Sequence, residues 1–408
     1  MDKGQNANLW LNHGLTFGSL AARSQPLAMA PNRRFPRLHN RRGVKKLSII
    51  PIMPFFVRQP SSESRYGTDS RQHNLRPRHR GCVATIGNFD GVHLGHQAIL
   101  AQLAEQAARL RLPRLVITFE PQPQEFFAGP KAPPARLMRL REKLLALDGL
   151  GIERVLCLEF DHRLAALPAH TFIDELLVHH LGVRYLVIGD DFRFGHRRAG
   201  DFAMLVQAGQ RHGFAVADNH SYLVDGERVS STRVRQALAQ GDLELAARLL
   251  GRPYDMCGRV AHGDRRGRTI GFPTANIHLH RRVTPVYGVY AVLLSGPGLQ
   301  LWPGIANVGR RPTVEGERER LEVHLLDFQG DLYGQHVKVD FLHYLRPEQR
   351  FASLADLQAR IQQDEHAARV WFAARGVGTS SPPTPLPPGE REAIPSPLTP
   401  FPSREGSA

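Results

Sequence analysis

The sequence has no hydrophobic run long enough to cross a membrane. Its best candidate, residues 47–57, spans 11 positions and is interrupted by Pro51 and Pro54, whereas a spanning helix needs roughly 18 apolar residues. A basic patch precedes this run, but it lies far from Met1 and no small-residue cleavage site follows, which argues against a signal peptide. We therefore expect a chain without a membrane partner.

Cysteine is also scarce, with three residues in 408. Cys82, Cys157 and Cys257 are widely separated, so their spacing predicts neither a zinc motif nor a disulfide framework. This cysteine usage suits a reducing compartment, and we expect a cytoplasmic protein.

Acidic residues are scarce only near the N-terminus. The net charge is +15, but residues 1–80 hold 15 Lys and Arg against 3 Asp and Glu, which leaves 38 basic and 35 acidic residues in 81–408. The nearly neutral body does not predict nucleic-acid binding. Residues 1–65 also lack a sustained hydrophobic period, so we predict a disordered basic extension, either a transit peptide or the product of a misassigned start codon. The Pro-rich segment 375–408 is predicted to be a disordered tail.

Residues 66–250 show strand-like apolar runs that alternate with helical patterns. This alternation predicts an α/β domain with a parallel sheet and helices on both faces. Ligands bind such sheets at the carboxyl ends of the strands. The domain is expected to end with a helix over 243–250, terminated by Gly251. The expected strands are 82–87, 114–119, 154–159 and 184–189, and the expected helices are 95–111, 137–148, 171–181 and 201–212.

The stretch from Gly87 to His96, GNFDGVHLGH, joins the first expected strand to the first expected helix. Its glycines let the backbone turn tightly and approach a ligand closely. The following helix directs free backbone N–H groups toward the loop, which suits a phosphate. His93 and His96 are three residues apart, so both rings can face one ligand and stabilise charge during phosphoryl or nucleotidyl transfer. The sequence has no Gly-Lys-Ser/Thr motif, which excludes a P-loop.

Two further clusters are expected at the same edge of the sheet. Residues 189–195, GDDFRFG, form an aromatic and charged loop after a predicted strand, although Phe192 and Phe194 can instead belong to the core. Residues 229–235, VSSTRVR, begin a helix with two arginines in its first turn. Positive charge there opposes the helix dipole, and a bound polyphosphate would compensate for it.

Residues 251–374 contain short strand-like runs without helices between them, which predicts a mainly antiparallel β-barrel. Glu322 and His324 are expected on the same face of one strand. The basic, glycine-rich segment 258–276 either wraps the phosphates of a nucleotide or forms an ordinary surface hairpin. An amphipathic helix over 353–368 is expected to close the module. The expected strands are 287–294, 301–308, 320–327 and 336–343, and the expected inner face of the helix carries Leu354, Leu357 and Ile361.

The first half resembles the FMN adenylyltransferase half of the bacterial bifunctional riboflavin kinase/FAD synthetase family. The resemblance rests on GNFDGVHLGH, which contains the His-x-Gly-His signature of nucleotidylyltransferases, on GDDFRFG and on VSSTRVR. It implies that His93 and His96 are catalytic. Gln122 replaces a histidine that is common in the family, so no role is assigned to it. The implied ATP-binding residues are Gly87, Asn88, Phe89, Asp90, His93, His96, Ser231, Thr232 and Arg235, and those near the flavin and the reacting phosphates are Asp191, Phe192 and Arg193.

The second half resembles riboflavin kinases, through PTAN at 273–276, GIANVGRRPT at 304–313 and EVHLLDFQGDLYG at 322–334. The resemblance makes Glu322 the base that takes the proton from the ribityl 5′-hydroxyl, which a positioned carboxylate can do. A hydroxyl and an amide two residues apart can both reach a Mg²⁺–phosphate group, because Mg²⁺ prefers oxygen ligands. The implied metal ligands are therefore Thr274 and Asn276, and the implied ATP-binding residues are Gly258, His262, Gly263, Gly267, Arg268, Thr274 and Asn276.

Taken together, the resemblance implies a bifunctional enzyme of flavin cofactor synthesis. The C-terminal half would phosphorylate riboflavin to FMN, and the N-terminal half would adenylylate FMN to FAD with release of pyrophosphate. Both steps imply Mg²⁺ and use ATP as co-substrate. The expected partners are the small molecules riboflavin, FMN and ATP, and a homo-oligomer is compatible with the sequence. Two alternatives are an adenylyltransferase with another substrate and a flavin-binding regulator that binds RNA through its basic N-terminal segment.

Overall fold

The computed structural model describes residues 48–53, 75, 77–128, 133–189, 191–219, 221–261, 271–281, 283–313 and 316–377. Most of the predicted N-terminal extension and of the C-terminal tail lies outside these residues, as does the segment 262–270. Among the described residues, no helix combines the length and the apolar character that a membrane span requires.

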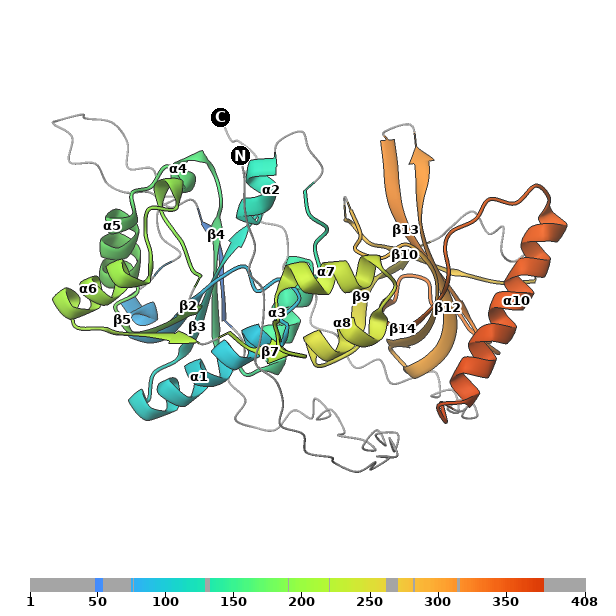
Figure 1. Ribbon diagram of the computed structural model, residues 1–408, viewed down its shortest axis with the longest axis horizontal. Helices are drawn as coiled ribbons and strands as arrows, with labels where there is room; N and C mark the ends of the chain where they lie inside the picture. Colours follow the sequence, from blue (N-terminus) through green and yellow to red (C-terminus); the bar gives the residue numbers. More distant parts are fainter. Residues whose placement is uncertain are drawn as a thin grey trace, which may run out of the picture. The chain divides into compact units, whose positions relative to one another are not determined.

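The first domain is built on a six-stranded sheet in which all neighbouring strands are parallel (Figure 1). The strand order is β1-β4-β3-β2-β5-β6, so β2 is an inner strand, and all of its residues are buried. Because β2 and β5 are parallel neighbours, the loops that follow them emerge at the same edge. The strands are β1 (Ser48–Met53), β2 (Cys82–Ile86), β3 (Arg114–Glu120), β4 (Arg154–Glu159), β5 (Val183–Gly189) and β6 (Ala215–Asn219).

Helices cover both faces of this sheet, which confirms the predicted architecture. Val83 packs in a buried cluster with residues of α1 and α3, whereas its neighbour Ala84 packs with residues of η2 and α6. Successive strand residues therefore face opposite layers, as the pleat of a strand requires. The helices of this domain up to residue 212 are η1 (Pro77–His79), α1 (Leu94–Leu110), α2 (Pro123–Ala128), α3 (Leu140–Gly149), α4 (His162–Ala165), α5 (Ala169–Thr171), η2 (Phe172–His180), η3 (His196–Arg198) and α6 (Phe202–His212).

β1 lies inside the segment 1–65 that the sequence predicts to be disordered, so the prediction is wrong for residues 48–53. Among the described strands this one pairs with β4 alone, at the edge of the sheet, and its register shifts between Ile50 and Met53. Pro51 lies in that interval. Proline has no N–H to donate to a neighbouring strand, so it is tolerated on an edge strand, where one side has no neighbouring strand. The short run has no period of two, which explains why its pattern does not predict a strand.

The sequence also misses α2 and β6 and begins α3 too early. The residues of β6 are exposed or only partly buried, so they lack a clear alternation of apolar and polar positions. The N–H groups of Leu137 and Met138 donate to the Asp90 carboxylate over 3.1 and 3.0 Å. These residues therefore precede α3, which begins at Leu140.

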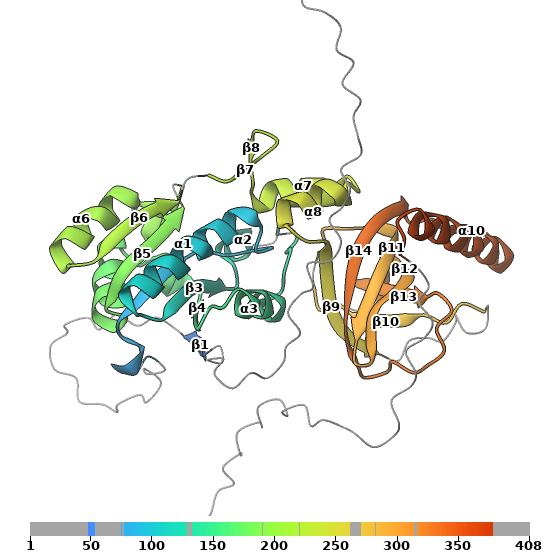
Figure 2. The same ribbon diagram turned by 90° about the horizontal axis from the view of Figure 1, so that it is seen from below.

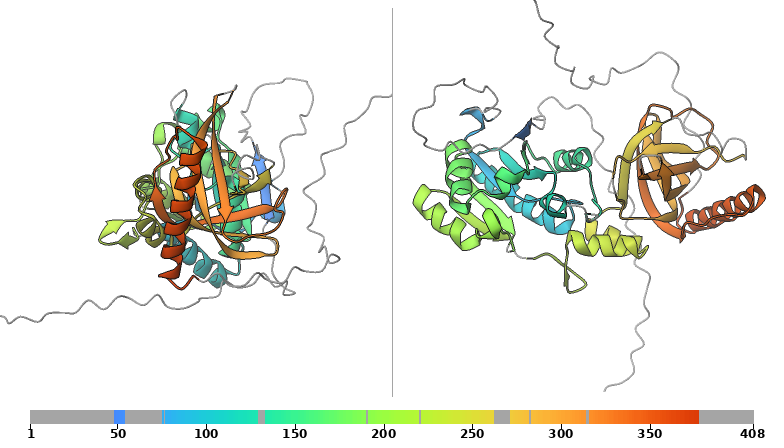
Figure 3. Two further views of the ribbon diagram at one scale, coloured as in Figure 1. Left: turned by 90° about the vertical axis from the view of Figure 1, so that its right-hand side faces the viewer. Right: turned by 90° about the horizontal axis from the view of Figure 1, so that it is seen from above.

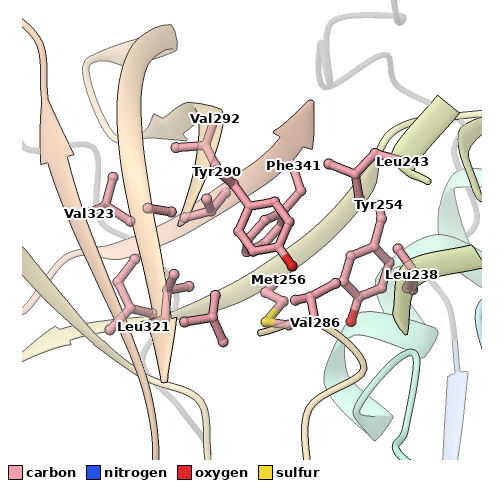
Figure 4. Packing of buried hydrophobic residues seen from close by; sticks show 14 of the residues in the cluster. Leu238, Leu243, Tyr254, Met256, Val286, Tyr290, Val292, Leu321, Val323 and Phe341 are labelled. Carbon is pink, nitrogen blue, oxygen red and sulfur yellow. The ribbon is translucent and has the colours of Figure 1, made fainter. Parts of the chain in front are cut away.

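The second domain is a closed barrel of six strands in the order β10-β13-β12-β11-β14-β9, with antiparallel pairing throughout. This confirms the predicted barrel. Its interior contains Met256, Tyr290 and Phe341 (Figure 4). The strands are β9 (Tyr254–Ala261), β10 (Ala275–His278), β11 (Gly288–Gly296), β12 (Leu299–Thr313), β13 (Gly316–Leu325) and β14 (His336–Arg346).

The long helix α10 (Leu354–Ala373) packs against the outside of the barrel (Figure 3). Its Ala368 and Phe372 lie in a buried cluster with Val289, which is on the opposite face of β11 from the interior residue Tyr290. The closing helix is therefore confirmed, but its predicted inner face is wrong at Leu354, which is 61% exposed. The contact with the barrel lies toward the C-terminal part of the helix, so the first turn remains in solvent.

The helix pair α7 (Ser231–Ala239) and α8 (Leu243–Leu250) follows the small hairpin of β7 (Leu223–Val224) and β8 (Glu227–Arg228). The two helices lie side by side (Figure 2), and Gly251 with φ 73° ends α8 as predicted. Leu238 and Leu243 share one buried cluster with Tyr254 and barrel residues (Figure 4). The hydrophobic core therefore continues across the sequence boundary predicted at residue 250.

Candidate active sites

The loop between β2 and α1 has an unusual backbone. Phe89, Gly91 and Val92 have φ angles of 48°, 85° and 44°, in a region that residues with a Cβ atom seldom adopt. The side chains of Phe89 and Val92 are nevertheless almost completely buried, at 1% and 2% exposure. Burial of these two anchors maintains the strained turn, and the turn places His93 at the N-terminus of α1.

His93 and His96 form a stacked pair with ring centroids 3.6 Å apart and planes inclined by 16°. His93 Nδ1 accepts a hydrogen bond from the backbone N–H of His96 over 3.3 Å, so this ring caps α1. Because Nδ1 is the acceptor, a neutral His93 carries its hydrogen on Nε2. Gly95 leaves room for this ring, since a Cβ there would make tight contacts of 3.2 Å with two atoms of the His93 ring.

Burial keeps both imidazoles neutral. Desolvation lowers the pKa of His93 to about 4, and the nearby Asp90 carboxylate opposes that shift only in part. The pKa of His96 also lies well below its usual value, first because of burial and then because of His93 and Lys143. Within the described part of the chain, Nδ1 of His96 is buried and has no hydrogen-bond partner. Near pH 7 both rings are therefore neutral.

The two histidines line a cavity of about 410 Å³ at the carboxyl edge of the sheet. The loop after β2, the loop after β5 and the start of α7 all contribute to its wall. The structure thus brings together three segments that are far apart in the sequence. The predicted residues that line this cavity are Gly87, Asn88, Phe89, Asp90, His93, His96, Asp191, Phe192, Arg193, Ser231, Thr232 and Arg235.

Asp90 is buried and holds several parts of the site together. Its carboxylate accepts the N–H groups of Leu137 and Met138, and Oδ2 also lies 2.5 Å from Nη2 of Arg235. Ser231 Oγ donates to the backbone carbonyl of Asp90 over 2.9 Å. The carboxylate therefore connects the loop after β2 to α7 and to the segment before α3.

The two arginines at the start of α7 already have protein partners, which corrects the argument that they require a polyphosphate. Arg235 pairs with Asp90 and donates to the Ala135 carbonyl. Arg233 lies 3.0 Å from a carboxylate oxygen of Glu227 and donates to the Val224 carbonyl. Their charge is balanced within the protein, although Arg235 still lines the cavity.

The two phenylalanines of the loop after β5, Phe192 and Phe194, lie in different environments. The rings of Phe192 and Phe194 stack with centroids 5.5 Å apart. Phe194 is 7% exposed and belongs to the core, whereas Phe192 lines the cavity. The neighbouring Asp191 pairs with Arg228, and Arg193 pairs with Asp201.

Sequence reasoning missed Lys143 of α3, which is fully buried. Its Nζ lies 3.4 Å from Oγ1 of Thr118, and that hydroxyl lies 3.5 Å from the Asn88 carbonyl. Desolvation lowers the pKa of Lys143, and the carboxylates of Asp90 and Glu120 oppose the shift. A signal was available, because Lys143 is one helical turn before the buried Leu147 and thus lies on the inner face of α3.

Gln122 also belongs to the cavity wall, although the sequence assigned it no role. Its side chain is 3% exposed, and its Nε2 has no partner within the described residues. A buried amide donor beside a cavity is costly unless a ligand or water satisfies it. Gln122 is therefore a candidate ligand contact.

In the barrel, Glu322 lies on the face of β13 opposite the buried Leu321 and Val323, as predicted. Its strand partners are Asn276 of β10 and Asn307 of β12. Arg320 Nε is 2.7 Å from Oε1 of Glu322 and also donates to Oδ1 of Asn276. Oδ1 of Asn307 is buried and has no partner among the described residues. Three side chains with oxygen ligands thus lie on adjacent strands.

A cavity of about 80 Å³ lies on the other face of β13, where Val323, Leu325 and Thr274 line it. The structure therefore places Thr274 in this cavity, and neither Asn276 nor Glu322 lines it. Gly258 has a packing role, because a Cβ there would lie 2.4 Å from Ile277 Cγ2. His262, Gly263, Gly267 and Arg268 lie outside the described residues.

The two halves match two known families in the same order. Residues 75–233 match the family described as FAD synthetase, and residues 250–372 match the family described as riboflavin kinase. The bifunctional riboflavin kinase/FMN adenylyltransferase of Escherichia coli (strain K12) is 56% identical over 301 residues, covering 74% of this chain and 96% of that protein. The protein of the same description from Pseudomonas fluorescens is 56% identical over 302 residues, with 74% and 96% covered.

A solved structure agrees with the two-domain fold. It is described as a macrolide-efflux protein from Streptococcus pneumoniae, and it has a TM-score of 0.62 at 32% identity, covering 71% of this chain and 94% of that chain. The identity to the bacterial enzymes, which extends over nearly their full length, is far above what shared fold alone produces. The chain therefore belongs to the bifunctional riboflavin kinase/FMN adenylyltransferase family.

Proposed function

We propose that this chain performs both reactions of its family. The barrel would transfer the γ-phosphoryl group of ATP to the 5′-hydroxyl of riboflavin, which forms FMN and ADP. The α/β domain would transfer AMP from a second ATP to the FMN phosphate, which forms FAD and pyrophosphate. The observation that carries this proposal is the pair of family matches in tandem, each on a domain that has its own cavity.

The adenylyl transfer needs little proton chemistry, because the FMN phosphate is already an anionic nucleophile. Catalysis can therefore depend on alignment and on charge stabilisation. His93 suits this role, since its neutral ring carries a hydrogen on Nε2 that can be donated to a phosphoryl oxygen. Arg193, Arg228 and Arg235 line the same cavity. Each is paired with an aspartate, so their remaining N–H groups can donate hydrogen bonds to phosphate oxygens without adding net positive charge.

The kinase step begins from a neutral hydroxyl, so it benefits from a base. Glu322 is the candidate, and Arg320 orients its carboxylate through the 2.7 Å contact. Because Glu322 lies on the face of β13 opposite the small cavity, we propose that riboflavin presents its hydroxyl on the side of Asn276 and Asn307.

Mg²⁺ is proposed as the cofactor of the kinase site. The oxygens of Asn276 and Asn307 and the carboxylate of Glu322 lie on adjacent strands, and Oδ1 of Asn307 has no partner in the described structure. This donor set fits a hard cation, with Asn276 and Asn307 as the proposed holders. Thr274, the other ligand expected from the sequence, lines the cavity on the opposite face of β13 and is not among them. The bound ion would supply neutralisation of phosphate charge.

A cytoplasmic location is also proposed. All three cysteines are free and buried, which is typical of a protein from a reducing compartment.

Chromatography of flavins tests the proposed function. Purified protein is incubated with riboflavin, ATP and Mg²⁺, and the expected sequence of products is FMN followed by FAD, with neither formed when EDTA replaces Mg²⁺. FMN alone would mean that the α/β domain has another substrate. If folded protein binds ATP but forms no flavin product, the alternative of an adenylyltransferase with a different substrate is favoured.

A further inference from the structure

A buried arginine after β10 reaches residues of the first domain. The side chain of Arg281 is only 2% exposed and lies 2.6 Å from a carboxylate oxygen of Glu142 in α3. Its Nη1 donates to the carbonyls of Arg136 and Leu137 over 2.7 and 3.2 Å and to the hydroxyl of Tyr254 over 3.1 Å. An arginine so completely buried is costly to desolvate, and several well-placed partners are needed to compensate.

Glu142 completes this cluster from the other side. Its carboxylate accepts the backbone N–H of Arg139 over 2.6 Å and that of Cys257 over 3.0 Å, in addition to its pair with Arg281. One carboxylate therefore binds both the start of α3 and strand β9 of the barrel. No atom of this cluster lines the cavity of the α/β domain or that of the barrel.

Leu137 links this cluster to the adenylyltransferase site. Its carbonyl accepts from the Tyr254 hydroxyl over 3.2 Å and from Arg281. Its N–H donates to the carboxylate of Asp90, as does that of Met138. Tyr254 and Arg281 of the barrel half therefore bind the carbonyl group of Leu137. The N–H group of the same residue binds the buried carboxylate of Asp90.

A second contact supports the same link. Arg252, just before β9, donates from Nη2 to the Gly91 carbonyl over 3.0 Å. Gly91 has φ 85° and lies within the strained turn that places His93. Both the Leu137 contact and the Arg252 contact therefore converge on the loop from Gly87 to His96.

We propose that Tyr254 and Arg281, which belong to the kinase half, are positioning residues of the adenylyltransferase site. Their hydrogen bonds fix the position of segment 136–138. That segment positions the Asp90 carboxylate, and Asp90 belongs to the loop that carries His93 and His96. The inference rests on the proposed adenylyl transfer and adds that its rate depends on side chains from the barrel. Neither residue touches the cavity, so their effect is on the geometry of the site rather than on the binding of substrate.

The test uses the full chain and measures its two reactions separately, with FMN and ATP for adenylyl transfer and with riboflavin and ATP for phosphorylation. Tyr254→Phe removes one hydroxyl and keeps the ring. Its matched control is Tyr290→Phe, because Tyr290 is buried in the same cluster and donates to the Tyr287 carbonyl over 2.8 Å within the barrel. Arg281→Met is matched with Arg346→Met, since Arg346 is paired with the buried Asp364 on α10.

Tyr254→Phe is expected to lower the kcat of adenylyl transfer by about two- to tenfold, the range for loss of one buried hydrogen bond. Arg281→Met is expected to lower it further, and Arg281→Lys to restore part of the loss because it keeps a charge beside Glu142. KM for FMN and for ATP should change less than about twofold, the kinase rate should stay at the level of the matched controls, and both controls should keep normal adenylyl transfer.

Three results would overturn the proposal: an unchanged adenylyl-transfer kcat in Tyr254→Phe, an equal fall in both activities, or an equal loss of adenylyl transfer in Tyr290→Phe. If Arg281→Met fails to fold, Tyr254→Phe decides alone. Failure of the proposed function is distinguishable, because the unsubstituted chain would then form no FAD from FMN.

Discussion

At the scale of single residues, His93 combines two roles that depend on its staying neutral. As the cap of α1 it must accept a hydrogen bond at Nδ1, which a protonated ring cannot do. As a candidate contact to phosphoryl oxygens it offers the hydrogen on Nε2. Burial favours the neutral ring, so the same environment supports both the helix and the site.

This coupling predicts a dependence of stability on pH. The pKa of His93 is lowered to about 4 in the folded chain, against about 6.5 for an unfolded histidine. The unfolded state therefore binds the proton first, and the contribution of His93 is fully present above about pH 6.5 and is lost as the pH falls toward 4. Between pH 7 and 5, the wild-type chain should lose about 2 kcal/mol more unfolding free energy than His93→Asn.

Urea unfolding at both pH values measures this difference. Asn keeps an oxygen that can cap α1, so the variant should fold. Parallel losses in the two proteins would show that His93 is not held neutral by the fold.

The pairings that sequence reasoning missed have a common physical cause. Arg235 meets Asp90, Lys143 meets Thr118, and the partners in each pair are far apart along the chain. A motif identifies which residue types are present, but a buried pairing depends on which helix face and which loop meet in space. The His-x-Gly-His stretch was predictable because its strand, turn and helix are continuous in the sequence.

At the scale of elements, α10 packs against the barrel through a few side chains. Phe372 is 3% exposed and lies with Ala368 in the cluster on the outer face of the barrel. Arg346 of β14 pairs with Asp364 of the helix over 2.7 Å. The N-terminal turn, in contrast, exposes Leu354, so the helix is attached mainly by its C-terminal half.

Phe372→Ala should therefore lower the unfolding free energy by about 3 kcal/mol, since it removes a large buried ring and leaves a cavity. Val370→Ala is the control two residues away, because Val370 is 57% exposed and surface changes usually alter stability by under about 0.5 kcal/mol. Urea unfolding followed by circular dichroism measures both. Similar losses in the two variants would contradict the packing described for α10.

Helices and strands with a strong local hydrophobic pattern were predicted well, whereas those with a weak hydrophobic pattern were not. The inner strands β2, β3, β4 and β5 are continuous apolar runs because both of their faces are covered. β1 and β6 are edge strands of the same sheet, where one side has no neighbouring strand and burial imposes less of a pattern. The start of α3 was misplaced because the Asp90 carboxylate, distant in sequence, takes the N–H groups of Leu137 and Met138.

At the scale of the whole molecule, the cavity lined by His93 and the one lined by Thr274 lie in two domains with different architectures. The proposed catalytic groups also differ in kind, with neutral imidazoles in the first domain and a carboxylate on β13 in the second. Glu322 takes no part in the cluster of Arg281, Glu142 and Tyr254. The two proposed chemical steps should therefore be separable by substitution even though the domains share a core.

We expect reciprocal defects from one substitution in each domain. His96→Ala should stop FAD formation while FMN accumulates from riboflavin. Glu322→Gln should block FMN formation while supplied FMN is still converted to FAD. Flavin chromatography with each substrate measures both steps, and each variant serves as the control for the fold of the other. Loss of both activities in a folded His96→Ala protein, or normal phosphorylation by Glu322→Gln, would contradict the assignment.

The burial of all three cysteines makes the chain convenient for site-specific labelling. Burial raises the pKa of Cys82 and Cys257 to about 12 and that of Cys157 to about 11, so at pH 8 only about one thiol in a thousand or fewer is the reactive thiolate. Maleimide dyes should therefore leave the native protein almost unmodified. A single cysteine placed at the exposed Val370 of α10 would then carry the only fluorophore, without prior removal of native cysteines.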